Sequence, residues 1–403
     1  MHQQGLDTRP AEALHAAGSL DILVLAPGTL GRLGNYVSGS TLFLEELCAA
    51  HGDRVTVLSP ERLWRNRGGA VYPRYERSGG FEIMRKGLDD SHVLAEDYAY
   101  FLERLEGRRF DVLLDLNDTT PEFRRILART FDLPVILTVE QAGARAGLPL
   151  SPGHPGEGAL SKSWRHVLDE VDAVVTWHIN DIPRLGRIGD NRVPVHHIYY
   201  AVGLLRSVEE YAALPRDRFQ GCCVGSLYAE PTHWKRSHEL EAAVPLILER
   251  TPVREFLICG PAADAEASAM LDRIKARHGD RVRHIFLPGD RDASIAEIAK
   301  SGFLYNPIGG NQIGSTPVEA WATGTPLILT GSTFGEHLRD CVQCGLDDLP
   351  LWVNRLYEDK KLLRRITTQG KRNYEASFSP QGMARGYRDV IMQCLARHGR
   401  KPQ

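Results

Sequence analysis

The sequence lacks an excess of charge of either sign. Its 403 residues include 49 Lys and Arg and 51 Asp and Glu, which gives a formal net charge of -2 at pH 7. Proteins that hold nucleic acid or anionic membranes by bulk charge carry a surplus of basic residues. We therefore expect no nucleic-acid partner, and each basic residue has to be interpreted from its own position.

Long hydrophobic runs are also missing. Nowhere do enough apolar residues follow one another to cross a bilayer, and the N-terminal MHQQGLDTRPAEALHAAGSLD has no apolar core of signal-peptide length. No basic amphipathic helix suited to membrane docking is present. The sequence predicts a cytoplasmic protein without stable membrane insertion, and residues 1–18 are expected to form a flexible arm.

Cysteine is sparse and unpaired in its spacing. The seven cysteines are an odd number, which fits a reducing compartment and mostly buried thiols. Cys341 and Cys344 form a lone C-x-x-C with no second pair and no neighbouring histidine pair. We interpret this pair as structural and predict no metal site.

The dinucleotide fingerprint G-x-G-x-x-G is absent as well. The first predicted strand is followed by APGTLGRLGNYVSGS, whose glycines have a different spacing, and Ser59 stands where an acidic residue would end the second strand. A nicotinamide-dependent dehydrogenase is therefore disfavoured. The loop is either a mobile surface segment or, through amides such as that of Gly28, part of a ligand cleft.

What the sequence does contain is a regular alternation of short β-branched runs and helix-like segments. Apolar runs of this length suit strands that are buried on both faces of a parallel sheet. They are DILVLA, RVTVLS, DVLLDL, PVILTV, DAVVTW and HHIYYAV in the first half, and GCCVGS, EFLICG, RHIFLP, FLYNP and PLILT after Pro215. The pattern predicts an α/β protein with two doubly wound, Rossmann-like domains.

The boundary between these domains is expected between Val202 and Asp217. We predict an N-terminal domain over residues 19–205 and a C-terminal domain over 216–379, followed by a helix over 380–398. That helix carries apolar residues at helical spacing and could pack on either domain. Ligands are expected in a cleft between the domains, at the carboxyl ends of both sheets.

The stretch from Asn306 to Leu329, NPIGGNQIGSTPVEAWATGTPLIL, is the most informative part of the chain. It predicts a strand, a glycine-rich loop, a short helix and a second strand. Glycines let the backbone approach a ligand, and a helix N-terminus suits a phosphate. Glu319, expected in the first helical turn, could accept hydrogen bonds from sugar hydroxyls beside that phosphate. A nucleotide sugar is the ligand that this pattern favours.

A structural interpretation of the same residues stays open. Thr316-Pro317-Val318-Glu319 also has the form of a capping box, with Pro317 at the first helical position. Glu319 would then bond only the amide of Thr316 and stabilise the helix end by about 1 kcal/mol.

Lys235 and Arg236 form the second candidate site. They precede an amphipathic helix in CCVGSLYAEPTHWKRSHELEAAVPLILE, after a strand and a polar loop. Two adjacent cations at the carboxyl end of a sheet could neutralise a diphosphate. The alternative is a solvated helix start without a ligand.

Polar residues at strand ends of the first half are weaker candidates. Asn117 and Asp118 follow DVLLDL, Glu140 follows PVILTV, and His178 follows DAVVTW. Each could face the cleft and bind an acceptor, or could contact only neighbouring backbone. Asp115 and Asp118 also have the spacing of a metal-binding acid pair or of a turn cap. His196 and His197 are assigned to a strand, and no Ser-His-Asp or Cys-His set is supported.

From Asp21 to His398 the chain resembles the GT-B glycosyltransferases of family 4. The family's C-terminal signature runs as Glu, seven residues, a second Glu, Ala and a Gly-x-Pro stop, and EAWATGTPLIL matches its second half. The resemblance implies that Glu319 binds the nucleotide ribose and that Lys235 binds the diphosphate. It also implies that the helix over 380–398 crosses back to pack on the first domain.

Three positions depart from the family pattern. Asn311 replaces the first acid of the signature, Ser226 stands near the place of a family arginine, and Glu140 replaces a histidine that touches the donor sugar. We hypothesise that Arg236 supplies the missing guanidinium. The residues expected to carry the chemistry are Lys235, Arg236, Glu319 and Glu140, and the donor is expected to contact Gly28, Gly225, Ser226, Asn311, Gln312, Ile313, Gly314, Ser315, Thr316 and Glu319.

The activity implied by the resemblance is transfer of a sugar from a nucleoside diphosphate sugar to a small-molecule acceptor, with retention at the anomeric carbon. The nucleotide sugar is a co-substrate, and no further cofactor and no metal are implied. A natural product with an amino group would suit an acceptor site lined by Glu140 and Asp118. A nucleotide-sugar epimerase, an inverting transferase with Glu140, Asp118 or His178 as base, and a non-catalytic nucleotide-sugar-binding partner stay open, as does assembly into a homo-oligomer.

Overall fold

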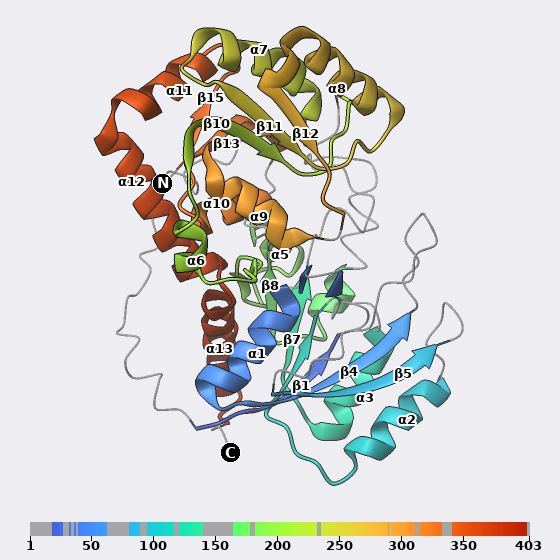
Figure 1. The fold of residues 1–403 in the computed structure, drawn as a ribbon. Coiled ribbons are helices and arrows are strands. Elements are labelled where there is room, and N and C mark those ends of the chain that lie inside the picture. Colours follow the sequence, from blue (N-terminus) through green and yellow to red (C-terminus); the bar gives the residue numbers. More distant parts are fainter. Residues whose placement is uncertain are drawn as a thin grey trace. The chain divides into compact units, whose positions relative to one another are not determined.

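The computed structural model describes residues 18–26, 32–33, 36–37, 39–62, 80–88, 95–116, 121–139, 164–177, 182–231, 235–288, 290–310, 314–332 and 341–400. The chain divides into two compact units (Figure 1). The first unit comprises Met1–Gly31, Ser40–Tyr200 and Met383–Gln403, and the second comprises Arg32–Gly39 and Ala201–Gly382.

The first unit is built on a seven-stranded parallel sheet with the strand order β5-β4-β1-β6-β7-β8-β9. Its strands are β1 (Asp21–Leu25), β4 (Arg54–Arg62), β5 (Glu82–Leu88), β6 (Val112–Asp115), β7 (Val135–Val139), β8 (Ala173–Thr176) and β9 (Val195–His197). The central strands β6, β7 and β8 are buried at every position, as their apolar runs predict. The assignment of His196 and His197 to a strand is confirmed by β9.

Helices α1 (Gly39–His51), α2 (Ala95–Leu105), α3 (Pro121–Phe131) and α5 (Ile182–Ile188) belong to this unit. The last helix, α13 (Pro380–Arg397), returns to it from Met383 onward. Tyr387 of α13 stacks on Phe43 of α1 with ring centroids 4.6 Å apart, and its hydroxyl lies 2.8 Å from the Thr138 hydroxyl of β7. Figure 1 shows α13 beside α1. The crossing of the C-terminal helix back to the first unit is therefore confirmed.

The second unit holds a six-stranded parallel sheet with the order β12-β11-β10-β13-β14-β15. Its strands are β10 (Asp217–Val224), β11 (Glu255–Cys259), β12 (Val282–Ile285), β13 (Ser301–Gly310), β14 (Leu327–Ser332) and β15 (Val342–Cys344). A two-stranded antiparallel ribbon, β2 (Arg32–Leu33) and β3 (Tyr36–Val37), is also assigned to this unit.

Two separate groups of helices pack on this sheet. Helices α7 (Leu240–Arg250), α8 (Ala265–His278), α11 (Leu349–Glu358) and α12 (Lys360–Asn373) share one large apolar cluster with the strands. Helices α6 (Val208–Ala212) and α9 (Arg291–Lys300) form a smaller cluster. Short helical segments run over Ser237–Glu239, Gly279–Arg281 and Tyr374–Phe378, and α10 (Ser315–Ala322) connects β13 to β14. The chain thus forms two doubly wound α/β units, as predicted.

The hydroxyl of Tyr387 provides a test of how α13 is held. Besides Thr138, it accepts a hydrogen bond from the Trp177 indole N–H at 3.2 Å, and the Tyr387 side chain is fully buried. Tyr387→Phe keeps the ring stacking but leaves buried polar partners unsatisfied, so we expect a loss of about 1–3 kcal/mol in the free energy of unfolding of the first unit. Urea unfolding followed by circular dichroism measures this loss, and a change below about 0.5 kcal/mol would contradict the role given to the hydroxyl.

Candidate functional site

The carboxyl ends of β10 and β11 approach each other through two glycines. Gly225 follows β10 with φ 137°, and Gly260 follows β11 with φ 144°. A Cβ on Gly260 would lie 2.1 Å from the Gly225 carbonyl oxygen. Only glycine satisfies both the backbone angle and this close approach. Gly225 and Ser226, two of the residues expected to contact the donor, therefore lie at the carboxyl end of β10, where the backbones after β10 and β11 are closely packed.

Helix α10 begins at Ser315, and its N-cap is Gly314, which is extended and has no side-chain cap. The capping-box interpretation of Thr316 and Glu319 is therefore wrong, because Thr316 is the second residue inside the helix. Pro317 is the third helical residue, not the first, and no acidic residue lies in the first turn. Glu319 is the fifth residue of the helix, just beyond the first turn in which it was predicted, and its carboxylate contacts another side chain.

Glu319 is paired with Arg291, the first residue of α9. The Arg291 Nη2 contacts the Glu319 carboxylate and donates a hydrogen bond to the Ser315 hydroxyl at 2.7 Å. Glu319 is fully buried, whereas the Arg291 side chain is 22% exposed. A buried carboxylate is costly without a cation, so this contact is required for α10 to place Glu319 where it is. We call these three residues the Arg291–Ser315–Glu319 cluster.

The cluster keeps hydrogen-bonding capacity for a ligand. The second oxygen of Glu319, Oε2, has no hydrogen-bond partner within the described part of the chain. Ordinary buried polar atoms in native proteins are satisfied, so an unsatisfied carboxylate oxygen points to an interaction that the free protein does not make. The amides at the start of α10 face the same end of the sheet and suit an anion.

Lys235 lies in the electrostatic field of this cluster. The pKa of its ammonium is below the usual value of a lysine, because the group is largely buried and because the positive charge of Arg291 acts on it. The ammonium is also 5.5 Å from the centroid of the Tyr228 ring. The positive charge of Arg291 thus acts on a second cation, Lys235, which follows β10 at the carboxyl end of the second sheet.

Arg236 is engaged in a different contact. Its backbone is left-handed, with φ 45°, and its guanidinium pairs with the buried carboxylate of Glu239. Glu239 also accepts a hydrogen bond from the Thr330 hydroxyl at 2.7 Å, and Thr330 lies 2.9 Å from the Tyr305 hydroxyl. Arg236 therefore joins a buried polar network, a contact that the sequence did not indicate.

The sequence analysis did not identify Arg291 as a candidate residue of this site. A signal was present, because Asp290 caps α9 and Arg291 follows it at the carboxyl end of β12. An arginine at a helix start beside the loop of β13 could have been weighed as the missing guanidinium.

Several predicted site residues lie outside the described residues. They are Gly28, Asn117, Asp118, Glu140, His178, Asn311, Gln312 and Ile313. Asp115, the first acid of the predicted pair, forms a buried salt bridge with Arg124 at 2.9 Å. That contact gives Asp115 a structural partner on α3.

The described residues contain no group of three or more His, Cys, Asp and Glu that could hold a metal ion. Within the same residues, none of the helices has the length and apolar character needed to span a membrane.

Comparison with known proteins places the fold. No family model and no curated protein sequence matches the chain. Among solved structures, sucrose-phosphate synthase from Thermosynechococcus elongatus superposes with a TM-score of 0.64 at 16% identity, over 94% of this chain and 100% of its own. A glycosyltransferase from Rickettsia africae gives 0.63 at 12% identity, over 94% and 99%. HepE from Anabaena in complex with UDP gives 0.62 at 14% identity, over 93% and 100%.

Each similarity covers nearly the whole of this chain and nearly the whole of the matched chain, while the sequence identities are low. At such identity a structural match establishes architecture and leaves chemistry to the site itself. The two parallel sheets, and the return of helix α13 to the first unit, agree with the architecture of these structures. The chain has the two-domain GT-B fold found in glycosyltransferases.

Proposed function

We propose that this protein is a glycosyltransferase that moves a sugar from a nucleoside diphosphate sugar to a small-molecule acceptor with retention of the anomeric configuration. The observation that carries the proposal is the convergence of Lys235 and the Arg291–Ser315–Glu319 cluster at the carboxyl end of the second sheet. A carboxylate beside two cations and a helix N-terminus matches a ribose next to a diphosphate.

In this proposal the donor is held by three kinds of group. The free oxygen of Glu319 accepts hydrogen bonds from the ribose hydroxyls. Lys235, Arg291 and the amides of Gly314, Ser315 and Thr316 face the diphosphate. Arg236 is the hypothesised alternative source of the guanidinium, although it is paired with Glu239 in the free protein. Because Gly225 has no side chain, the backbone at Gly225 and Ser226 can approach the nucleotide closely.

The chemistry follows from stabilising the leaving group. When the anomeric bond breaks, negative charge develops on the diphosphate, and cations that are already in place stabilise that charge without reorganisation. A front-face displacement then lets the leaving phosphate accept the acceptor's proton, which requires no protein nucleophile. Asn311 and Glu140 are proposed to contact the donor sugar, and Asn117, Asp118 and His178 the acceptor.

The nature of the donor can be tested with a panel of UDP-, GDP-, ADP- and dTDP-sugars, with thermal unfolding as the measurement. UDP-glucose is the first candidate, because HepE has been crystallised with UDP and with UDP-glucose. A ligand at 100 times its Kd should stabilise the protein by about 2.7 kcal/mol. We expect one nucleotide class to do so, and Glu319→Ala to weaken its binding by about tenfold or more.

Glu358→Ala is the matched control for this test, because Glu358 is exposed at the end of α11 and should leave binding unchanged. A flat response to every nucleotide sugar would overturn the proposal. Unchanged binding by Glu319→Ala would show that the donor site is misplaced. Anomeric proton couplings in the product distinguish retention from inversion, and epimerised donor without transfer would indicate an epimerase.

The roles of the two arginines can be separated by comparing Arg291→Ala with Arg236→Ala. If Arg291 touches the diphosphate, Arg291→Ala should weaken binding of a nucleoside diphosphate by about 10- to 100-fold more than it weakens binding of the corresponding nucleoside, which loses only the positioning of Glu319. Arg236→Ala should lower stability by freeing the buried Glu239 and should change affinity less. Calorimetry with both ligands measures this difference, and equal losses for nucleoside and diphosphate would mean that Arg291 only positions Glu319. Arg291→Lys keeps a cation should Arg291→Ala fold poorly.

The depressed pKa of Lys235 predicts how donor affinity depends on pH. The ammonium form binds the diphosphate, and Lys235 loses its proton at a lower pH than an ordinary lysine because of burial and the nearby Arg291. Affinity for the nucleoside diphosphate should therefore be full at low pH and fall as the pH rises through that pKa. Calorimetry between about pH 7 and 10 covers the window below the usual lysine pKa of about 10.4. Lys235→Arg should abolish this pH dependence of affinity, whereas the control Lys361→Arg should keep it. If Lys235→Arg gave the same pH profile as the unsubstituted protein, the assignment of the titrating group to Lys235 would be contradicted.

A further inference from the structure

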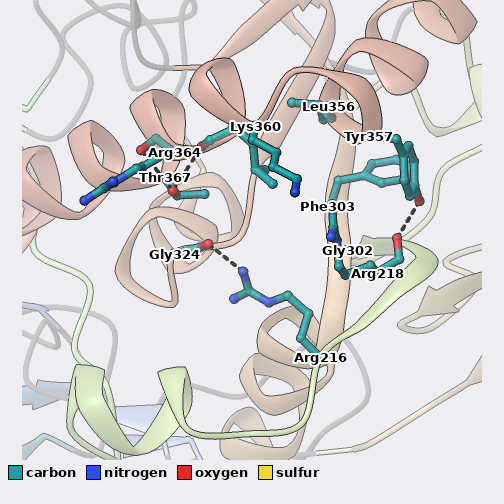
Figure 2. Close-up of a pocket in the computed structure, with 11 residues that line it drawn as sticks. Arg216, Arg218, Gly302, Phe303, Gly324, Leu356, Tyr357, Lys360, Arg364 and Thr367 are labelled. Carbon is teal, nitrogen blue, oxygen red and sulfur yellow. Dashed lines mark hydrogen bonds between the residues drawn. The ribbon is translucent and has the colours of Figure 1, made fainter.

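The second unit has a cavity of about 400 Å³ at the amino-terminal ends of β10 and β13. Its walls include Arg216 and Arg218 beside the start of β10, and Tyr357, Lys360, Arg364 and Thr367 from α11 and α12. Figure 2 shows Arg216 and Lys360 on opposite sides of it. Because the strands are parallel, this end of the sheet is opposite to the carboxyl end that holds the Arg291–Ser315–Glu319 cluster.

All charged side chains that line the cavity are positive. Arg216, Arg218, Lys360 and Arg364 are cations, and no described carboxylate lines it. Within the described residues, none of these four forms a salt bridge. Like charges around one cavity repel each other, so an anion bound there relieves an unfavourable arrangement.

The neighbouring acids are directed to other partners. Asp217 accepts a hydrogen bond from the Phe219 amide at 2.8 Å and pairs with Arg254 at 3.7 Å. Asp359 accepts hydrogen bonds from the amides of Lys361 and Leu362, both at 2.9 Å. The N-terminus of α12 is thus already capped, and a ligand would be held by side chains.

Arg216 is fixed in place by the ends of two helices. Its guanidinium donates to the carbonyl oxygens of Ala299 at 3.0 Å, Thr323 at 3.0 Å and Gly324 at 2.8 Å. Figure 2 shows the contact with Gly324 across one side of the cavity. Burial lowers the pKa of this guanidinium, because its charge is poorly solvated and has no carboxylate beside it. A preorganised, poorly solvated cation is well suited to bind an anion.

We propose that this cavity is a binding site for a small phosphate-bearing polyanion, such as a diphosphate or a phosphate ester, separate from the donor site. Its volume is that of a small-molecule pocket. The cations surround one cavity and do not form a stripe, which disfavours nucleic acid. A ligand that contacts Arg216 lies one hydrogen bond from Thr323 and Gly324, the residues that follow the helix carrying Glu319.

Inorganic pyrophosphate is the probe, and Lys235→Ala is the background, because that change weakens pyrophosphate binding at the proposed donor site. Binding is measured by calorimetry in the full-length protein at constant ionic strength, since salt screens exposed charges. We expect saturable binding in this background. Lys360→Glu with Arg364→Glu should weaken it by about tenfold or more, because two charge-assisted contacts are replaced by repulsion.

Lys361→Glu with Arg365→Glu is the matched control, with the same change in net charge on exposed residues of α12 that do not line the cavity. It should change the affinity by less than about threefold, as expected for a screened long-range effect. Equal losses in both double variants, no loss in the cavity variant, or no binding in the Lys235→Ala background would each overturn the site. Lys360→Gln with Arg364→Gln serves the same test should the glutamate variant fold poorly.

Discussion

A fully buried carboxylate requires a cation, and this constraint organises the carboxyl end of the sheet in the second unit. Glu319 has no exposure to solvent, and Arg291 supplies the charge that makes its burial tolerable. The same arginine donates to Ser315, and its charge adds to the effect of burial in lowering the pKa of Lys235. One ion pair therefore sets the start of α9 against the start of α10 and determines the electrostatic field that a diphosphate would meet.

The start of α9 is held from its other side as well. Asp292, next to Arg291, accepts hydrogen bonds from Arg206 at 3.0 Å and from the Tyr211 hydroxyl of α6. These contacts reduce the freedom of the helix that carries Arg291. A site whose cations are positioned before the ligand arrives needs little reorganisation when charge develops on a leaving group.

Helix α10 connects two chemically different ends of the sheet. Its first residues belong to the proposed donor site, whereas the carbonyls after its last turn bind Arg216 at the basic cavity. The helix has only eight residues, from Ser315 to Ala322, and nearly all of its side chains are buried. Close packing on all sides leaves this helix little room to move.

Local pattern was enough for strands that carry an apolar run, including the edge strands β9 and β12, and failed for two edge strands that do not. Each predicted apolar run contributes to a strand, although HHIYYAV does so only through His196 and His197 of β9. Central strands of a parallel sheet carry such runs because they are buried on both faces. Strands β5 and β15 were not predicted. The first has the charged sequence EIMRKGL, and the second has three residues. Both are edge strands, which tolerate charge and short length because they pair on one side only.

The sequence by itself determined the two α/β units and identified Glu319 and Lys235 as residues of interest. Only the tertiary structure decided which groups these side chains meet, because the contacts join distant segments. Arg291 and Ser315 are 24 positions apart, and Thr330 and Glu239 are 91 positions apart. Spacing along one helix or strand cannot reveal such pairs. The four cations of the basic cavity are brought together in the same way, by the parallel order of β10 and β13 and the packing of α12 beside them.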